Sequence, residues 1–462
     1  MKKFLIALVI VAGTATLLPI IGNSVAQKTL KENIDLFCAN GVEIKNETSY
    51  SSYLNTKNHY EFRLKDAPKF VKFINQYSDA QLPPYVEAAI SGVTIGVDIE
   101  YSNFPISSKI ILDIYPITLP QELEQELKQE SINFYNYVDK LLQAKGVLYH
   151  MNYYISEDIF DGFIKDIDET YVFDNGNEMI FKLLNATYYG EGPIIAPKSL
   201  HTNILDIVLD VSDKQNDETL LFKAKELKTS STFESQSTYA SSASLKNFSF
   251  LLKEHQKKKV GASIEEFKIN ISSNVQANAG EFYTKMSLKE IKINTRDERS
   301  IKVNDINYDI SLDGVDKDSY EELRVLTSHS GVTNSPDFEQ KLQRVVTKIL
   351  SKGLSLSVPD MSIKKITLDN ETPVDGFSFM SRMTLNEDLN LEQHLKSSPK
   401  EILKNINLAS TLKLSKGFFA LINENVPLSS LAGAFVKEQN DKLIFEVKLN
   451  AGVLSINGKV IN

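Results

Sequence analysis

The 462-residue sequence contains a single cysteine, Cys38. One cysteine cannot form a disulfide within the chain, so the fold has to rest on its apolar core even in an oxidising compartment. Cys38 can still link two chains, but its neighbours Leu36 and Phe37 favour a buried, apolar thiol. The sequence therefore predicts a protein without internal covalent cross-links.

The chain also lacks an excess of basic residues. It has 51 Lys and Arg against 60 Asp and Glu, which gives a formal charge of −9 at pH 7. Proteins hold nucleic acids mainly through Lys and Arg contacts to phosphates, so we expect no nucleic acid partner. An apolar content of 42% is typical of a folded protein, and the length allows two or three domains or one elongated body.

Catalytic and metal-binding motifs are missing as well. No two histidines have the spacing of metal ligands, and no H-E-x-x-H, G-x-S-x-G or P-loop pattern occurs. His255 precedes Lys257–Lys259, which predicts a basic hairpin tip that is either a solvated turn or a contact to anionic headgroups. We therefore predict no catalytic, cofactor-binding or metal site, and no enzyme. The six histidines are His59, His150, His201, His255, His329 and His394.

Acidic clusters come closest to a binding site. One cluster offers oxygen ligands of the kind that calcium prefers, although glycine and glutamate are missing from the positions that an EF-hand loop needs. The alternative is that Asp318 and Ser319 cap a helix whose first turn holds the glutamates, where negative charge suits the helix dipole. The cluster consists of Asp313, Asp316, Asp318, Glu321 and Glu322.

Two further groups of aspartates are weaker candidates. Asp161, Asp166 and Asp168 are expected in a solvated loop and at the edge of a helix. Asp206 and Asp210 share one face of an expected strand, which holds their backbones about 13 Å apart. A hydrolase would need such carboxylates to converge in a cleft, and the spacing alone does not supply one.

What the sequence does have is an apolar N-terminal segment. After lysines at positions 2 and 3, residues 4–21 carry no charged side chain. A helix of this length rises about 27 Å, close to the hydrocarbon thickness of a bilayer. We expect residues 1–26 to anchor the chain by a single pass in a bacterial inner membrane, with the body in the periplasm. The alternatives are cleavage near Ala26, which leaves a soluble periplasmic protein, and a buried helix.

From about residue 203 onward, short segments alternate apolar and polar residues. In the clearest one, Ile306, Tyr308, Ile310 and Leu312 occupy every second position. A period of two predicts strands, and polar residues between the apolar ones predict antiparallel sheets with one face toward water. Similar segments cover residues 267–271, 291–293, 377–379 and 445–449.

Three of these segments share one pattern, in which two polar residues separate two apolar ones. They are Ser244–Phe248, Ser263–Phe267 and Ser287–Ile291. Their spacing is too irregular for a solenoid repeat. We interpret them as the starts of strands in a long meander of hairpins.

Helices are fewer. Residues 118–121 resemble a capping box, after which an apolar stripe that includes Leu127 and Phe134 runs until Gly146. A second amphipathic helix is expected over residues 335–353, where Gly353 provides the stop. Shorter helices are expected at residues 69–77, 320–328, 399–406 and 428–437.

The expected strands outnumber the helices that can cover their apolar faces. The sheet must then curl on itself or pack against a second sheet, or a bound lipid or partner protein must fill an apolar groove. An apolar sheet of this length without any cover would aggregate. The composition of the strands therefore predicts a binding or self-association surface unless the sheet closes.

The last stretch carries a family resemblance. Residues 449–459 read as a strand, a turn at Gly452, a second strand and an Asn457-Gly458 turn, preceded by a helix from about Leu428. This order resembles the C-terminal end of the YdgA-like family of bacterial envelope proteins, which is catalogued as a domain of unknown function. The resemblance implies an N-terminal anchor, a β-rich body and an envelope location. It implies no catalytic residue.

Together these features predict an α+β protein. It consists mostly of a long antiparallel meander with a few amphipathic helices covering one face, after one N-terminal transmembrane or signal helix. We expect an anchor at residues 1–26, an α+β region at 27–200 and a β-rich region at 201–462. The expected function is non-enzymatic binding or scaffolding in the envelope, with lipid or an envelope protein as partner. The alternatives are a self-associating structural protein, a homo-oligomer, and a periplasmic hydrolase with convergent carboxylates.

Overall fold

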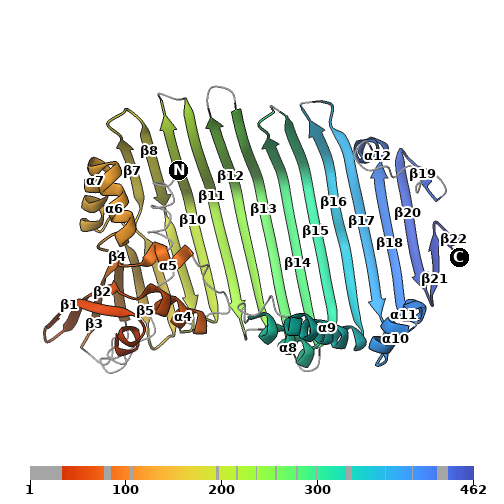
Figure 1. Ribbon diagram of the computed structural model, residues 1–462, viewed down its shortest axis with the longest axis horizontal. Coiled ribbons are helices and arrows are strands. Elements are labelled where there is room, and N and C mark those ends of the chain that lie inside the picture. Colours follow the sequence, from red (N-terminus) through yellow and green to blue (C-terminus); the bar gives the residue numbers. More distant parts are fainter. Residues whose placement is uncertain are drawn as a thin grey trace. The chain divides into compact units, whose positions relative to one another are not determined.

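The computed structural model describes most of the chain after residue 33 (Figure 1). The expected anchor at residues 4–21 and the cleavage position at Ala26 lie outside the described residues. Within the described residues, no helix has the length and apolarity that a membrane crossing requires. The described ranges are 34–77, 85–103, 109–193, 197–214, 217–235, 237–254, 258–276, 279–297, 299–328, 336–369, 371–397, 399–423 and 435–461.

The chain divides into two compact units. The first unit extends to Lys214 and also includes Leu227–Ser230, and the second unit contains the remainder. The sequence-based division at residue 200 falls inside a strand, β10 (Ser199–Asp213). The boundary between the units passes through β11 (Glu218–Phe233).

The first unit is built on an antiparallel sheet in which β2 lies between β1 and β3, and β4, β5 and β6 follow in chain order. Strand β9 then pairs with β6 and with the first half of β10, while β8 pairs with β7 and with the second half of β10. The bounds are β1 (Val42–Ser51), β2 (Asn55–Leu64), β3 (Thr94–Ser102), β4 (Lys109–Pro116), β5 (Tyr149–Tyr154), β6 (Ile159–Ile164), β7 (Ile167–Val172), β8 (Glu178–Leu184) and β9 (Ala186–Glu191).

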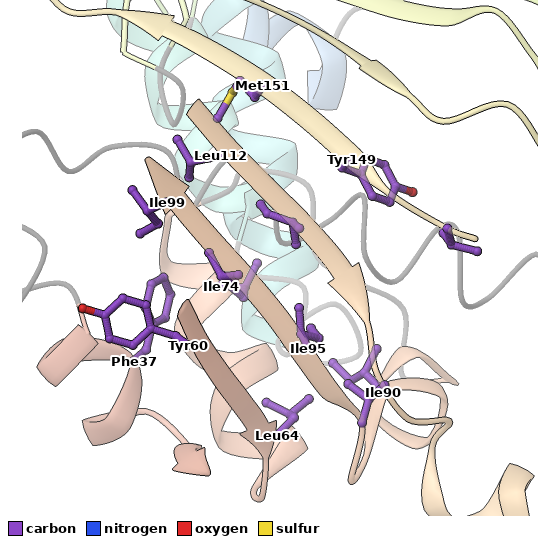
Figure 2. Packing of buried hydrophobic residues seen from close by; sticks show 14 of the residues in the cluster. Phe37, Tyr60, Leu64, Ile74, Ile90, Ile95, Ile99, Leu112, Tyr149 and Met151 are labelled. Carbon is purple, nitrogen blue, oxygen red and sulfur yellow. The ribbon is translucent and has the colours of Figure 1, made fainter. Parts of the chain in front are cut away.

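One face of this sheet is sealed by helices. Helix α4 (Ala67–Tyr77) is amphipathic, and its Phe70 and Phe73 pack on Phe37 with ring centroids 6.1–6.4 Å apart. Together with α5 (Tyr85–Ile90) they cover a continuous apolar cluster, in which Val97 and Ile114 are 0% exposed. Figure 2 shows strand residues of this cluster packing from neighbouring strands. The first unit therefore has a conventional buried core.

The single helix expected after residue 118 is divided in two. Helix α6 (Gln121–Glu130) ends at Ser131, whose extended backbone breaks the helix and whose side chain accepts a hydrogen bond from the Phe134 amide. Helix α7 (Ile132–Gln143) ends with Ala144 as its C-cap, and Lys145, which has a positive φ, follows, while the amide of Gly146 donates to the Leu141 carbonyl. The apolar stripe concealed this break because serine both caps and interrupts helices.

Cys38 is exposed, which contradicts the expected buried thiol. It lies in a short helical segment at residues 34–39, where Ile34 and Phe37 point into the core. Helical periodicity places the positions next to Phe37 on the outer face, so an apolar neighbour in sequence does not imply burial. Partial desolvation, with the charge of Asp35 adding to it, raises the pKa of the Cys38 thiol.

The second unit is an antiparallel meander, which confirms the expected β-rich class. Each strand from β12 to β17 pairs with the next in sequence. Strand β20 then pairs with β18, β19 and β21, and β21 with β22. The bounds are β12 (Tyr239–Glu254), β13 (Lys258–Gln276), β14 (Ala279–Asn294), β15 (Ser300–Asp316), β16 (Leu354–Leu368), β17 (Val374–Leu385), β18 (Ile406–Ser415), β19 (Lys437–Gln439), β20 (Lys442–Asn450), β21 (Val453–Ile456) and β22 (Lys459–Ile461).

The helices of the second unit lie mainly at one end of its strands (Figure 1). The expected helix before Gly353 is α9 (Pro336–Ser351), and the residue that follows it with positive φ is Gly353, as predicted. Helix α12 (Lys416–Asn423) instead stacks its Phe418 on Phe377 of β17, with ring centroids 5.4 Å apart. The others are α8 (Lys317–Ser328), α10 (Leu391–Ser397) and α11 (Pro399–Lys404).

The closing hairpins form as predicted. Ala451-Gly452 and Asn457-Gly458 have positive φ at both positions, and each dipeptide joins two paired strands. The helix expected at residues 428–437 lies largely outside the described residues, and its last position, Lys437, begins strand β19.

Candidate functional site

The repeated motif of the second unit does not start strands, which corrects the sequence interpretation. Its copies lie in the middle of β12, β13 and β14 and are aligned across the sheet. The central polar positions form a row that we call the polar row, and β15 and β16 continue it. It consists of Lys246, Glu266, Lys289, Asp305 and Lys364.

Two features identify the polar row as a line of irregularities in the sheet. Glu266 and Asp305 have φ values of 50° and 51°, a left-handed conformation that non-glycine residues seldom adopt inside a strand. The charges alternate along the row and pair across strands. Lys289 Nζ lies 2.7 Å from Glu266, and Lys364 Nζ lies 3.3 Å from Asp305.

At the polar row, the regular alternation of side chains between the two faces of the sheet is interrupted. Lys289 Nζ lies 2.7 Å from the carboxylate of Glu266 and 4.0 Å from that of Glu265. Consecutive residues of a regular strand point to opposite faces, so a shared partner indicates that both glutamates point to the same face. The apolar residues on either side of them, Ile264 and Phe267, then share the other face. The sheet thus keeps one face apolar and one polar along the length of its strands.

This apolar face is only partly covered. At one end, Tyr320 of α8 packs on Phe282 with ring centroids 4.9 Å apart, and Val345 of α9 is buried. Away from that end, Leu288 of β14 is 8% exposed, while the other large apolar side chains on this face of β13 to β17 remain half-buried or exposed. We use the name apolar face for Phe267, Ile269, Met286, Ile306, Tyr308, Ile310, Met361, Ile363 and Phe379.

The strands that carry this face are long. Strands β12 and β14 have 16 residues each, and β13 has 19. At a rise of about 3.3 Å per residue, a 16-residue strand extends about 50 Å. The apolar face occupies the middle of these strands: on β15 it runs from Ile306 to Ile310, which is about 13 Å along the strand.

A second candidate lies on the polar face of the sheet in the first unit. His59, Asp98, Asp113 and His150 occupy one register row across β2, β3, β4 and β5. His59 Nδ1 lies 2.6 Å from Asp98, and His150 Nδ1 lies 2.7 Å from Asp113. His59, Asp98 and Asp113 line a groove of about 380 Å³. We call these four residues the His–Asp row.

The electrostatics of the His–Asp row favour charged groups. Partial burial disfavours the charge on Asp98, but hydrogen bonds from Lys145 and His59 outweigh it and hold the pKa of Asp98 below its usual value. Burial likewise disfavours the charge on Lys145, yet the bond of 2.6 Å to Asp98 raises the pKa of that ammonium group. Lys145 Nζ also lies 4.0 Å from the ring centroid of Tyr115. Asp98 of the row and Lys145 beside it therefore form a pair of opposite charges.

The two histidines differ in the contacts that their imidazole rings make. Both nitrogens of His59 face acids, because Nε2 lies 3.5 Å from Glu61. His150 keeps Asp113 at Nδ1, and its ring stacks on Phe163 at 4.8 Å between centroids. His150 is therefore the better placed of the two to exchange a proton through its second nitrogen.

In the acidic cluster of β15 and α8, Asp316, Glu321 and Glu322 form hydrogen bonds and ion pairs within the fold. Asp316, rather than Asp318 or Ser319, caps α8, and it accepts hydrogen bonds from the Ser319 amide at 3.0 Å and hydroxyl at 2.6 Å. Glu321 pairs with Arg324 at 2.9 Å, and Glu322 pairs with Arg344 and Lys348 of α9. Among the residues that the structure describes, no group of His, Cys, Asp and Glu is placed to hold a metal ion.

The weaker aspartate candidates lie on strands and at turns, apart from one another. Asp161 accepts from Asn152 at 2.9 Å, Asp166 from the Asn185 amide at 2.7 Å, and Asp168 pairs with Lys182 at 2.7 Å. The expectation of a helix edge was therefore wrong, because all three belong to β6, β7 and the turn between them.

Asp206 and Asp210 pair with β8 four residues apart, opposite Leu184 and Ile180, and they form no convergent pair.

The remaining histidines are dispersed. His201 stacks on Tyr189 at 4.5 Å between centroids, and His394 Nδ1 lies 2.8 Å from Asp388. His255, His329 and Lys257 lie outside the described residues, and the other two lysines of the expected basic tip, Lys258 and Lys259, begin β13.

No family model, curated protein or solved structure matches this chain. The resemblance to the YdgA-like family stays a prediction.

Proposed function

We propose that this chain is a membrane-anchored envelope protein of bacteria that binds lipid through the apolar face of its second unit, without catalysing a reaction. The half-buried apolar side chains along β13 to β17 carry the proposal. A folded protein seldom leaves so extensive an apolar surface in water, and such surfaces mark binding sites or interfaces.

The shape of the apolar face favours acyl chains over a globular client. The face spreads over five neighbouring strands, β13 to β17, and none of its nine residues is charged. Flexible hydrocarbon chains adapt to such a surface, and each buried methylene contributes about 0.8 kcal/mol. In this proposal, helices α8 and α9 cover one end of the face and leave the rest to the lipid.

The proposed location follows from the N-terminal segment. Residues 4–21 would cross the inner membrane once and hold the body in the periplasm, beside a supply of lipid. Cleavage near Ala26 would instead leave a soluble periplasmic carrier with the same face. The binding surface is the same in both cases.

Co-purification tests the proposal. The full chain is purified from membranes in a mild detergent, and lipids are extracted and quantified by mass spectrometry. A matched pair of variants assigns any lipid to a face. Ile269→Lys places a charge on the apolar face, while Asn270→Lys places the same charge on the polar face one residue away.

We expect the wild type and Asn270→Lys to co-purify with a stoichiometric amount of lipid. In Ile269→Lys, the amount of bound lipid should fall at least five-fold. A lipid-free monomer would contradict the proposal. A co-purifying envelope protein would indicate that the face binds a client protein rather than lipid. A dimer that dissociates in Ile269→Lys would indicate the self-associating structural protein.

Hydrolysis is the second candidate, and the His150–Asp113 pair favours it. Asp113 would orient the ring of His150, and the second nitrogen would take a proton from an attacking water. Hydrolysis of a p-nitrophenyl ester that is lost in His150→Gln and retained in His201→Gln would support this function. Equal rates in both variants and in buffer would contradict it.

A further inference from the structure

We infer that the polar face of the second unit contains a binding site for an extended, acidic oligosaccharide. The site is a groove of about 790 Å³ that runs across β13 to β20, on the side of the sheet opposite the apolar face. This site is independent of the lipid proposal.

Charge is the first observation. Six lysines line the groove, against the carboxylates of Glu266, Asp305 and Asp375, whereas the chain as a whole carries a charge of −9. Local positive charge in an acidic protein favours an anionic ligand. The six are Lys268, Lys289, Lys364, Lys365, Lys413 and Lys442.

The pairing of these lysines divides them into two groups. Lys289 and Lys364 belong to the polar row and pair with Glu266 and Asp305. The other four have no ion-pair partner among the described residues. Lys413 is half-buried, so its charge loses hydration without gaining a protein carboxylate. An anionic group of a ligand would supply the missing partner.

The position of the lysines excludes one common structural role. Lysines on edge strands prevent sheets from pairing edge to edge. Strands β13, β16, β18 and β20, which carry these lysines, each pair with a strand on both sides. The lysines are therefore not needed to protect an edge.

Polar side chains connect the two ends of the groove. One register row runs from Lys268 on β13 to Lys413 on β18, and every residue between them carries a hydroxyl or an amide. Asn307 donates to Ser362 at 3.4 Å within this row. The intervening residues are Ser287, Asn307, Ser362 and Ser378.

This row fixes the chemistry of the ligand. Five strand spacings of about 4.8 Å separate Lys268 from Lys413, which makes about 24 Å. A single phosphate cannot contact both lysines. A sugar chain with carboxylates or phosphates can place anionic groups at both ends and hydroxyls against the serines and the asparagine.

Titration calorimetry on the full chain tests the site with oligogalacturonate, a chain of acidic sugars. We expect the hexamer to bind at least ten-fold more tightly than the dimer. Added salt should lower the affinity of the protein for the hexamer. The double variant Lys268→Gln/Lys413→Gln should raise the Kd of the hexamer at least ten-fold. Lys448→Gln, on β20 but outside the groove, should leave it unchanged.

Other results would overturn the inference. Equal affinities for dimer and hexamer, or displacement of the hexamer by inorganic phosphate at an equal concentration, would show a single-anion pocket instead. Equal losses of hexamer affinity in the double variant and in Lys448→Gln would show that the hexamer is held by non-specific electrostatic attraction. Absence of hexamer binding together with binding to phosphatidylglycerol vesicles would assign the lysines to lipid headgroups.

Discussion

The two units bury their sheets in different ways. In the first unit, helices seal one face of the sheet, and side chains such as Val97 and Ile114 are 0% exposed. In the second unit, strands of 15 to 19 residues such as β13 and β16 pair along their whole length, yet the apolar face stays half-buried. The first unit thus has a fully buried core, whereas the second unit leaves the apolar side chains of its sheet half-buried.

The comparison shows that strand pairing and core burial are separate sources of stability. Pairing satisfies the backbone groups of the second unit, and the polar row keeps its apolar side chains on one face. Burial, in contrast, is left incomplete at the place where we propose lipid binding.

Truncation of the core should separate the two units most clearly. Ile114→Ala removes a fully buried side chain and should cost the first unit about 3 kcal/mol, because the cavity adds to the lost burial. Ile310→Ala removes a half-buried side chain and should cost the second unit about 1 kcal/mol. Hydrogen exchange with mass spectrometry measures each unit by its own peptides. Equal losses of stability in the two units would contradict the difference in burial between them.

Acid should act on the first unit through Asp98. Its pKa is lower in the folded state, so the ionised group stabilises that unit at neutral pH, and this contribution is lost as the pH falls through the folded-state pKa. Asp98→Asn should cost about 2 kcal/mol at pH 7 and flatten the dependence of unfolding free energy on pH below about 4. Urea unfolding at several pH values checks this. An unchanged pH dependence would show that the His–Asp row does not contribute.

The polar row should tolerate glycine better than a β-branched residue. Asp305 has a φ of 51°, so Asp305→Val should make the second unit about 1–2 kcal/mol less stable than Asp305→Gly. Both variants lose the exposed pair with Lys364, so that loss cancels in the comparison. Exchange rates of β15 peptides give the difference. Equal stability of the two variants would mean that the strand is regular at this position.

Cys38 provides the smallest expected effect and a control for the first prediction. It belongs to the first unit but is exposed, so Cys38→Ser should change the stability of that unit by less than about 0.5 kcal/mol. Thermal unfolding in the presence of a reductant measures the change. A loss comparable to that of Ile114→Ala would show that membership of the unit, rather than burial, sets the cost.

Several parts of the fold were predictable because their signals are local. The alternation around Ile310 predicted a strand, Gly353 predicted a helix end, and Asn457-Gly458 predicted a turn. Each signal is contained within a few neighbouring residues. The meander followed from the same information, since consecutive antiparallel strands need only short connections.

Other parts were not predictable because they depend on register. The shift in alternation at Glu265-Glu266 looked like the start of a strand, and only its alignment with Lys289 and Asp305 shows that it is an irregularity inside the sheet. The His–Asp row joins residues 37 and 39 positions apart in sequence, for which the sequence supplies no pairing signal. The lysine groove likewise requires that seven strands, β13 to β18 and β20, be placed in order.

Photo-crosslinking in living cells tests the central proposal most directly. Bacteria that express the full chain are fed a fatty acid with a photoactivatable group, irradiated before any detergent is added, and the crosslinked peptides are identified by mass spectrometry. Our account predicts crosslinks to the apolar face of the second unit, such as Phe267, Met286 and Tyr308. Crosslinks confined to the N-terminal segment, or spread equally over both faces of the sheet, would contradict it.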